Sequence, residues 1–210
     1  MSRLTIIVAA TKANGIGVNA GLPWKLSKEL KYFAQATTTA PEGRQNVVIM
    51  GRNTWESIPT KFRPLPRRMN VVVSRNTSYD LCTSTSSVHL THDLKSALGI
   101  LTPSKAEAES IHRGFVIGGA RLYTEALKLP VSSTEPYVDR ILLTRILTPE
   151  FVECDVFIPD FLTEGLTDEA EIWKRATHKD LQEWVGFNVP EGELEEKGVK
   201  YEFQMWVRGT

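Results

Sequence analysis

The sequence predicts an α/β fold: a single domain over residues 1–210 with a mostly parallel central sheet of about eight strands, flanked by helices. In the first part of the chain, short apolar runs alternate with helix-like runs, as expected where buried parallel strands are linked by helices. From Val138 onward, strand-like runs follow one another without such helices. The sheet should therefore end in antiparallel strands, including a C-terminal hairpin.

The expected strands are short runs rich in apolar and β-branched residues. They are LTIIVAA (4–10), NVVIM (46–50), MNVVVS (69–74), SVHL (87–90), GFVIG (114–118), VDRILLTRI (138–146), EIWKRATH (171–178) and VKYEFQMWV (199–207). The first five suit the centre of a sheet that is covered on both faces. In the last, Tyr201, Phe203, Met205 and Val207 alternate with other residues, which suits an antiparallel edge or hairpin strand.

Helices are expected at 27–36, where Ser27 is a good cap, and at 52–57, 93–101 and 120–129. Two segments resemble surface insertions. The segment 102–112 should form a short polar helix, and 130–138 should form a loop because it contains two prolines and three hydroxyl residues. The acidic stretch 190–198 should be the turn of the C-terminal hairpin. Its acids should lie in solvent, since hard cations need a tighter ligand pattern.

The first expected helix carries an acid on its apolar side. At 3.6 residues per turn, Leu26, Leu30 and Phe33 fall on one face, opposite Lys28, Lys31 and Gln35. Glu29 lies three residues after Leu26 and four before Phe33, so it sits among apolar side chains. Burying an unpaired carboxylate is costly. Glu29 is therefore either a surface acid at the helix edge, an acid paired to a buried partner, or a functional group.

Composition excludes several classes of protein. The chain has 25 basic and 25 acidic side chains, so its charge gives no reason to expect a nucleic-acid or membrane partner. Cys82 and Cys154 lack neighbours at metal-ligand spacing and are expected as reduced thiols. The apolar run 4–10 is barely long enough for a signal peptide, and no run approaches the length of a membrane span. We expect a cytoplasmic monomer without a metal.

A glycine-containing segment, NGIGVNAG (14–21), follows the first strand. It nearly matches the dinucleotide fingerprint G-x-G-x-x-G, but its last spacing is one residue too long and Leu22-Pro23-Trp24 stands where a helix should open. It should therefore be a flexible loop. Ile16, Leu22 and Trp24 would be out of place in a plain surface loop, so the loop should cover something.

Three strand ends carry residues suited to an extended, phosphate-bearing ligand. Ligands of open α/β sheets bind beyond the carboxyl ends of strands, and glycines let a phosphate approach backbone N–H groups. The residues at these ends are Gly51, Arg52, Asn53 and Thr54, then Ser74 and Arg75, and finally Gly118 and Gly119. The chain has neither a P-loop motif nor a G-x-S-x-G nucleophile elbow.

A Pro-rich turn, FRPLPRRMN (62–70), places Arg67 and Arg68 just before a strand. Either arginine could be an ordinary solvated charge. A guanidinium held by such a turn is also suited to bidentate capture of a carboxylate.

Six of these stretches together resemble the dihydrofolate reductase family, in a eukaryotic and fungal-like form. They are IVAATKANGIGVNAGLPWKLSKELKYF (7–33), VIMGRNTWESIP (48–59), RPLPRRMNVVVSR (63–75), FVIGGARLYTEAL (115–127), ILLTRI (141–146) and EEKGVKYEFQMW (195–206). They follow the family's order and span nearly the whole chain. The departures are the two insertions, and Asn53, Asn76 and His92 near the expected adenosine end.

The resemblance implies a dihydrofolate-reductase-like fold and an NADPH-dependent oxidoreductase. Such an enzyme reduces 7,8-dihydrofolate to 5,6,7,8-tetrahydrofolate by hydride transfer to C6 and protonation of N5. The product would supply one-carbon metabolism and thymidylate and purine synthesis, and antifolates would be inhibitors. A cis peptide is implied between Gly118 and Gly119.

The resemblance also implies residue roles. The catalytic positions are Glu29, Leu22, Trp24 and Thr144. The substrate positions are Ile7, Val8, Glu29, Leu30, Phe33, Ile58, Leu65, Arg68, Ile117, Tyr123 and Thr144, with Arg68 rather than Arg67 on the α-carboxylate of the glutamate tail. The cofactor positions are Ala9, Ile16, Gly17, Gly21, Gly51, Arg52, Asn53, Thr54, Ser74, Arg75, Asn76, Ile117, Gly118, Gly119, Ala120, Arg121, Leu122 and Tyr123.

Two alternatives differ in what they require. A reductase of the same fold acting on another heterocycle, such as a riboflavin-pathway pyrimidine, should lack the acid after LPW and the arginine before VVVS, and both are present. A catalytically silent NADPH-binding module would not need Leu22, Trp24, Glu29 and Thr144 together.

Overall fold

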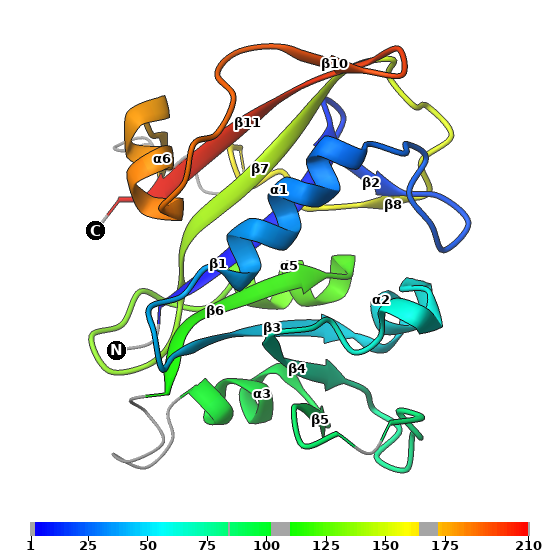
Figure 1. Ribbon diagram of the computed structural model, residues 1–210, viewed down its shortest axis with the longest axis vertical. Coiled ribbons are helices and arrows are strands. Elements are labelled where there is room, and N and C mark those ends of the chain that lie inside the picture. The colour runs from blue at the N-terminus through cyan, green and yellow to red at the C-terminus, as the bar shows by residue number, and fades with distance from the viewer. Residues whose placement is uncertain (1–2, 84, 102–109, 164–171, 210) are drawn as a thin grey trace. The chain divides into compact units, whose positions relative to one another are not determined.

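A computed structural model describes residues 3–83, 85–101, 110–163 and 172–209 of the chain (Figure 1). The strands are β1 (Leu4–Thr11), β2 (Gly15–Gly17), β3 (Gln45–Gly51), β4 (Arg68–Val73), β5 (Val88–Thr91), β6 (Ile111–Gly118), β7 (Val138–Thr148), β8 (Val156–Phe157), β9 (Trp173–Arg175), β10 (Leu194–Glu196) and β11 (Val199–Arg208). The helices are α1 (Ser27–Thr38), α2 (Arg52–Ser57), α3 (Leu94–Leu101), α5 (Ala120–Leu127) and α6 (His178–Val185), with a 3-10 turn at Thr60–Phe62.

The predicted fold class is confirmed. Eight strands follow the order β10-β11-β7-β1-β6-β3-β4-β5, and β9 adds to β11. Parallel pairs dominate the side that contains β3, whereas the C-terminal strands pair antiparallel. The chain divides into two compact units. The first comprises the N-terminal residues up to Thr5 with Thr37–Val138, and the second comprises Ile6–Ala36 with Asp139–Thr210.

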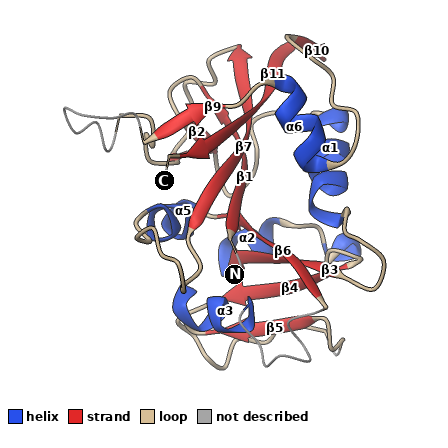
Figure 2. Cartoon of the chain, turned by 90° about the vertical axis from the view of Figure 1, so that its left-hand side faces the viewer, coloured by secondary structure: helices blue, strands red, loops and turns tan. Residues whose placement is uncertain are grey.

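The first unit is built on the parallel run β6-β3-β4-β5. The central strands are apolar on both faces, and Val47–Met50, Val71, Val72, Phe115 and Val116 are fully buried. Helix α3 packs on β4 and β5, and α5 packs on β6 and β3 (Figure 2). This arrangement explains why continuous apolar runs predicted these strands correctly, since a strand covered on both faces has no polar side.

The second unit contains the run β10-β11-β7-β1, in which β11 lies between β10 and β7. The predicted alternation in β11 is confirmed in part: Tyr201, Phe203 and Met205 are buried, but Val207 is only half-buried and Gln204 is buried as well. Helix α1 crosses in front of β1 and β7 (Figure 1). Helix α6 packs against β11. Among the described residues, none of the helices has the length and apolar character needed to span a membrane.

One predicted strand was largely wrong. Residue 171 lies outside the described residues; of 172–178, only Trp173–Arg175 is a strand, and helix α6 begins at His178. A capping box starts this helix: the Thr177 hydroxyl accepts from the Asp180 N–H, and the Asp180 carboxylate accepts from the Thr177 N–H. The short strands β2, β8 and β10 were not predicted from the sequence.

Three predicted boundaries also need correction. Residues 102–109 of the first insertion lie outside the described residues, and Ile111 and His112 belong to β6 rather than to an insertion. The loop predicted at 130–138 is present, but Val138 is already the first residue of β7. In the acidic stretch 190–198, Leu194–Glu196 forms β10, so the turn itself is at Lys197 and Gly198.

Candidate functional site

In the second unit, helix α1 places Glu29 in a buried position beside β7. The Glu29 side chain is 6% exposed, and the Thr144 hydroxyl donates to its Oε1 at 3.2 Å. Burial raises the pKa of Glu29 to about 7, although the hydrogen bond from Thr144 opposes this rise and the charge of Glu196 adds to it. A carboxyl group with this pKa can both accept and release a proton near neutrality.

The buried face of α1 differs from the predicted face. Leu26, Tyr32 and Ala36 are buried beside Glu29, whereas Leu30 is 55% exposed and Phe33 is half-buried. The Tyr32 ring packs on Phe203 with ring centroids 4.1 Å apart. Glu29 lies close enough to Tyr32 and Tyr201 for its charge to act on both, and its own burial is the main cause of its raised pKa.

The buried polar atoms of this unit that have no hydrogen-bond partner among the described residues include Trp24 Nε1, Tyr32 Oη and Tyr201 Oη. Negative charge on Glu29 helps to raise the pKa of both tyrosines, after the larger effect of burial. Buried polar groups are normally satisfied by protein, water or ligand. The surroundings of Glu29 thus offer donors and acceptors for a polar ligand or ordered water.

The start of α1 is held by an acid from the C-terminal hairpin. The Glu196 carboxylate accepts from the N–H groups of Ser27 at 2.7 Å and Lys28 at 2.9 Å. This contact corrects two predictions. Ser27 was predicted as the helix cap, but it is the first helical residue, and its N–H is capped by Glu196. The carboxylate of Glu196 is not simply solvated, because it satisfies backbone donors that the helix leaves unpaired.

The segment predicted as a loop over the site contains β2, which pairs with β8. Gly15 lies so close to Cys154 that a Cβ there would be 2.7 Å from the Cys154 Cβ. Leu22 is half-exposed, whereas Trp24 is buried and meets the Phe151 ring edge-on at 5.3 Å. The tryptophan end of the segment is thus anchored, and the leucine is free to contact a ligand.

In the first unit, the ends of β3 and β6 meet at the predicted glycines. Met50 pairs with Gly118, and the peptide between Gly118 and Gly119 is cis, as predicted. Gly118 has φ +129°, and a Cβ there would lie 3.1 Å from the Thr54 hydroxyl oxygen. A Cβ on Gly51 would lie 3.6 Å from the Gly119 nitrogen. These side-chain-free positions leave the backbone open to a phosphate.

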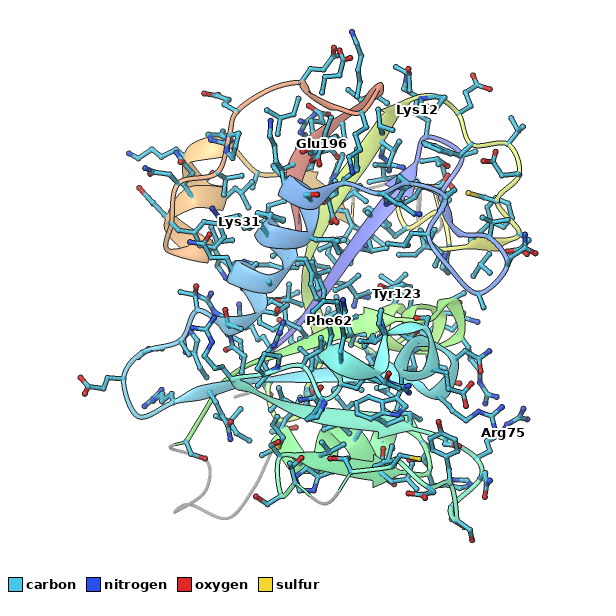
Figure 3. All side chains as sticks on the ribbon, turned by 45° about the vertical axis from the view of Figure 1, so that its right-hand side comes forward. Lys12, Lys31, Phe62, Arg75, Tyr123 and Glu196 are labelled. Atoms are coloured by element: carbon cyan, nitrogen blue, oxygen red, sulfur yellow. The ribbon has the colours of Figure 1, made fainter. Side chains whose placement is uncertain are left out.

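The polar residues at the neighbouring strand ends lie nearer the surface. Arg52 is half-exposed, pairs with Glu56 at 3.7 Å and stacks on the Tyr79 ring at 5.8 Å. Ser74 is buried, and Arg75 is exposed at the end of the unit (Figure 3). No ion pair involves Arg75 within the described part of the chain.

The two arginines of the Pro-rich turn have different environments. Arg67 is exposed and has φ +59°, whereas Arg68 is buried. Arg68 donates through Nη1 to the Thr37 hydroxyl at 2.5 Å and through Nε to the Pro66 carbonyl at 3.1 Å. Burial, and secondarily the charge of Arg67, lowers the pKa of Arg68 to about 10. Within the described residues this guanidinium bonds only to neutral oxygens, so it is well suited to an incoming carboxylate.

The other predicted site residues divide between the units. In the second unit, Ile7 and Val8 are buried in β1, while Ala9 and Ile16 are half-buried. In the first unit, Leu122 and Tyr123 are buried, and Arg121 is exposed and paired with Glu125. Four further residues of the first unit are half-buried: Ile58, Leu65, Ile117 and Ala120. Exposed positions are Asn53 and Asn76 in the first unit and Gly21 in the second.

A separate cleft of about 370 Å³ lies within the second unit. Its walls come from Thr11–Ala13, Ile146, Leu147, Glu150–Val152, Cys154 and Phe157. None of the predicted site residues lines it. No group of three or more metal-ligating side chains occurs in the described ranges.

Comparisons with known proteins identify the kind of enzyme. The chain matches the family model for dihydrofolate reductase over residues 3–189. Dihydrofolate reductase of Cryptococcus neoformans var. neoformans serotype D is 47% identical over 221 residues, covering 97% of this chain and 94% of that protein. The Pneumocystis carinii enzyme is 44% identical over 211 residues, covering 98% and 96%. The solved structure of Schistosoma mansoni dihydrofolate reductase superimposes with a TM-score of 0.76 at 34% identity, covering 99% of both chains.

The fold and these matches define an α/β oxidoreductase. The chain belongs to the dihydrofolate reductase family, as its fungal-like resemblance predicted.

Proposed function

We propose that this protein catalyses the NADPH-dependent reduction of 7,8-dihydrofolate to 5,6,7,8-tetrahydrofolate, with hydride transfer to C6 and protonation of N5. The observation that carries the proposal is Glu29: a buried acid with a pKa of about 7, bonded to Thr144, in a chain of this family. Its product would serve one-carbon metabolism and the synthesis of thymidylate and purines.

In the second unit, Glu29 accepts a pair of hydrogen bonds from the pterin amino group and the adjacent ring N–H. The Thr144 hydroxyl orients the carboxylate. Glu29 assists N5 protonation because its pKa lies close to neutral pH. Trp24 and the half-exposed Leu22 exclude water from the reacting atoms. The apolar side chains of Ile7, Val8 and Phe33 contact the pterin and its aryl extension.

In the first unit, the chain holds the phosphates of the cofactor and the glutamate tail. Bound NADPH supplies the hydride. The backbone around Gly118, Gly119 and Gly51 fits a phosphate-bearing ligand because a side chain there would fill the space beside Thr54. Arg52, Ser74 and Arg75 bind the 2′-phosphate, and Arg68 binds the α-carboxylate of the substrate.

The direct test is NADPH consumption by the purified protein with dihydrofolate. We expect turnover that depends on both substrates and is blocked by antifolates that mimic the pterin. A protein that binds NADPH without turnover would be a silent binding module. Turnover with a pyrimidine of the riboflavin pathway, and none with dihydrofolate, would identify the other reductase class.

Arg68→Ala is expected to raise the KM for dihydrofolate far more than Arg67→Ala. Arg68 is buried and its guanidinium is held by Thr37 and Pro66, whereas Arg67 is exposed. Loss of a charge-assisted contact of this kind costs roughly 2–3 kcal/mol, or about 30- to 150-fold in KM. Steady-state kinetics of the two variants make the comparison. Inhibitors without a glutamate tail should be nearly indifferent to both, and a greater loss in Arg67→Ala would reverse the assignment.

Arg75→Ala is expected to weaken NADPH binding selectively. The exposed guanidinium has no acid partner among the described residues and lies beside Ser74 and Asn76, where a 2′-phosphate would bind. We expect a loss of roughly 1–3 kcal/mol for NADPH and almost none for NADH. Dissociation constants of both cofactors measure this. Equal losses would place Arg75 outside the 2′-phosphate site.

A further inference from the structure

Glu196 makes two backbone contacts at the start of the helix that carries Glu29. Its Oε1 accepts from the Ser27 N–H at 2.7 Å and its Oε2 from the Lys28 N–H at 2.9 Å. Figure 3 shows Glu196 beside the beginning of α1. Both oxygens of one carboxylate thus engage consecutive amides. Glu29 is the next residue, so the backbone from which it projects is fixed from outside the helix.

The hairpin that supplies Glu196 also supports the partner of Glu29. Glu196 pairs with Val199 across the β10–β11 turn. Further along β11, Phe203 pairs with Thr144 of β7, whose hydroxyl donates to Glu29. The C-terminal hairpin therefore sets both the backbone of Glu29 and the strand that carries its hydrogen-bond donor.

The charge of Glu196 acts on Glu29 as well. The hydrogen bond from the Lys28 N–H is the main cause of the lowered pKa of Glu196, so this acid stays ionised at neutral pH. Its negative charge then helps to raise the pKa of Glu29, as does burial. The partial positive charge at the N-terminus of α1 would otherwise stabilise ionised Glu29, and the negative charge of Glu196 offsets this effect.

Other described groups also interact with Glu29. The Thr144 hydroxyl of β7 donates to it, and its charge acts on Tyr32 of α1 and Tyr201 of β11. Tyr32 and Tyr201 stay neutral near pH 7, since burial raises the pKa of Tyr201 to about 12 and moves that of Tyr32 the same way. Among the described residues, Glu196 is accordingly the ionised group whose charge raises the pKa of Glu29.

We propose that Glu196 is a positioning residue for Glu29: its carboxylate fixes the first turn of α1 and keeps Glu29 able to hold a proton at neutral pH. This role rests on the proposed function of Glu29 in dihydrofolate reduction. In this role Glu196 acts through the backbone of α1 and through its charge.

The test compares three variants with the wild-type protein. Glu196→Gln keeps the shape and one acceptor oxygen but removes the charge, and Glu196→Ala removes both contacts. Glu195→Gln is the matched control, because it removes one charge from the same strand at an exposed position facing Lys200. The measurements are kcat/KM for dihydrofolate across the pH range 5–9, and the pKa of Glu29 from side-chain ¹³C NMR titration.

We expect the Glu196 variants to lower the pKa of Glu29, because both the like charge and the helix cap are weakened. Turnover that needs protonated Glu29 then begins to fall at a lower pH. At pH 8, kcat/KM should be about three- to tenfold below wild type, with Glu196→Ala the more affected. Glu195→Gln should match wild type, and the KM for NADPH should not change in any variant.

The experiment separates a failure of the role proposed for Glu196 from a failure of the proposed function. An unchanged Glu29 titration in both Glu196 variants, or a loss of thermal stability without any shift of the pH profile, would reduce Glu196 to a structural cap and overturn the proposal. An equal shift in Glu195→Gln would also overturn it, since charge anywhere on β10 would then suffice. An inactive wild-type protein would instead refute the proposed function, and the NMR titration would still decide the role of Glu196.

Discussion

Glu29→Gln is expected to lower the rate of dihydrofolate reduction at pH 7 by on the order of 10²–10⁴, the usual worth of general acid–base assistance. The amide keeps the shape of the side chain and can still contact Thr144. It cannot deliver a proton toward N5, and it offers the pterin one acceptor oxygen in place of two. NADPH binding should be almost unchanged, because the residues assigned to the cofactor phosphates lie in the first unit.

Acid should partly rescue this variant. Substrate protonated in solution no longer needs the carboxyl group, so hydride transfer would proceed from that protonated fraction. The measurement is a pH–rate profile of Glu29→Gln beside wild type, using single-turnover hydride transfer. Near-normal activity at pH 7, or a variant as slow in acid as at neutrality, would show that Glu29 does not have this role.

Glu29→Gln is also expected to remove a pH dependence of stability. Burial raises the pKa of Glu29 from 4.5 to about 7 in the folded protein. A group whose pKa is raised in the folded state stabilises the folded protein fully at pH values below its unfolded-state pKa. This stabilisation is lost as the pH rises through the folded-state pKa. The wild-type protein should therefore lose on the order of 3 kcal/mol from this residue between about pH 4.5 and pH 8.

Denaturant unfolding of both proteins at pH 5 and pH 8 would measure this effect. The comparison is the change in free energy of unfolding between the two pH values, so a constant cost of the amide cancels. Other acids contribute equally to both proteins and also cancel. If the two proteins lose the same stability between these pH values, the carboxyl group is not desolvated in the folded state.

The sequence predicted most strands of the sheet, including the C-terminal strand β11 to within one residue. Helix α2 was predicted with its observed bounds, and the five early strands to within a few residues. Helix α6 was missed because Trp173 and its neighbours favour a strand. The local signals for α6 were nevertheless present: Thr177 and Asp180 have capping-box spacing, and Leu181 and Val185 recur at one helical turn.

In the candidate site, local sequence patterns located some residues and missed others. Glu29 could be found because a helical wheel places an acid among apolar residues, but the wheel assigned Leu30 to the face that Tyr32 occupies. An amphipathic tyrosine fits either side of a helix, so periodicity alone does not place it. The contact of Glu196 with Ser27 joins residues 169 positions apart. No local pattern encodes such a contact, and it emerges only from strand pairing.

The position of β11 between β10 and β7 has a consequence for how the protein is made. A ribosome releases residues 6–36 first, then the whole of 37–138, and only afterwards the strands that complete the second unit. The first unit can therefore fold while its partner still lacks an interior strand. Helix α1 is synthesised early. Its apolar surface and the N–H groups at its start stay uncovered until residues 194–208, which include Glu196 and β11, have been made. During this interval the incomplete second unit exposes apolar surface and an unpaired strand edge, the features that make a nascent chain prone to aggregate.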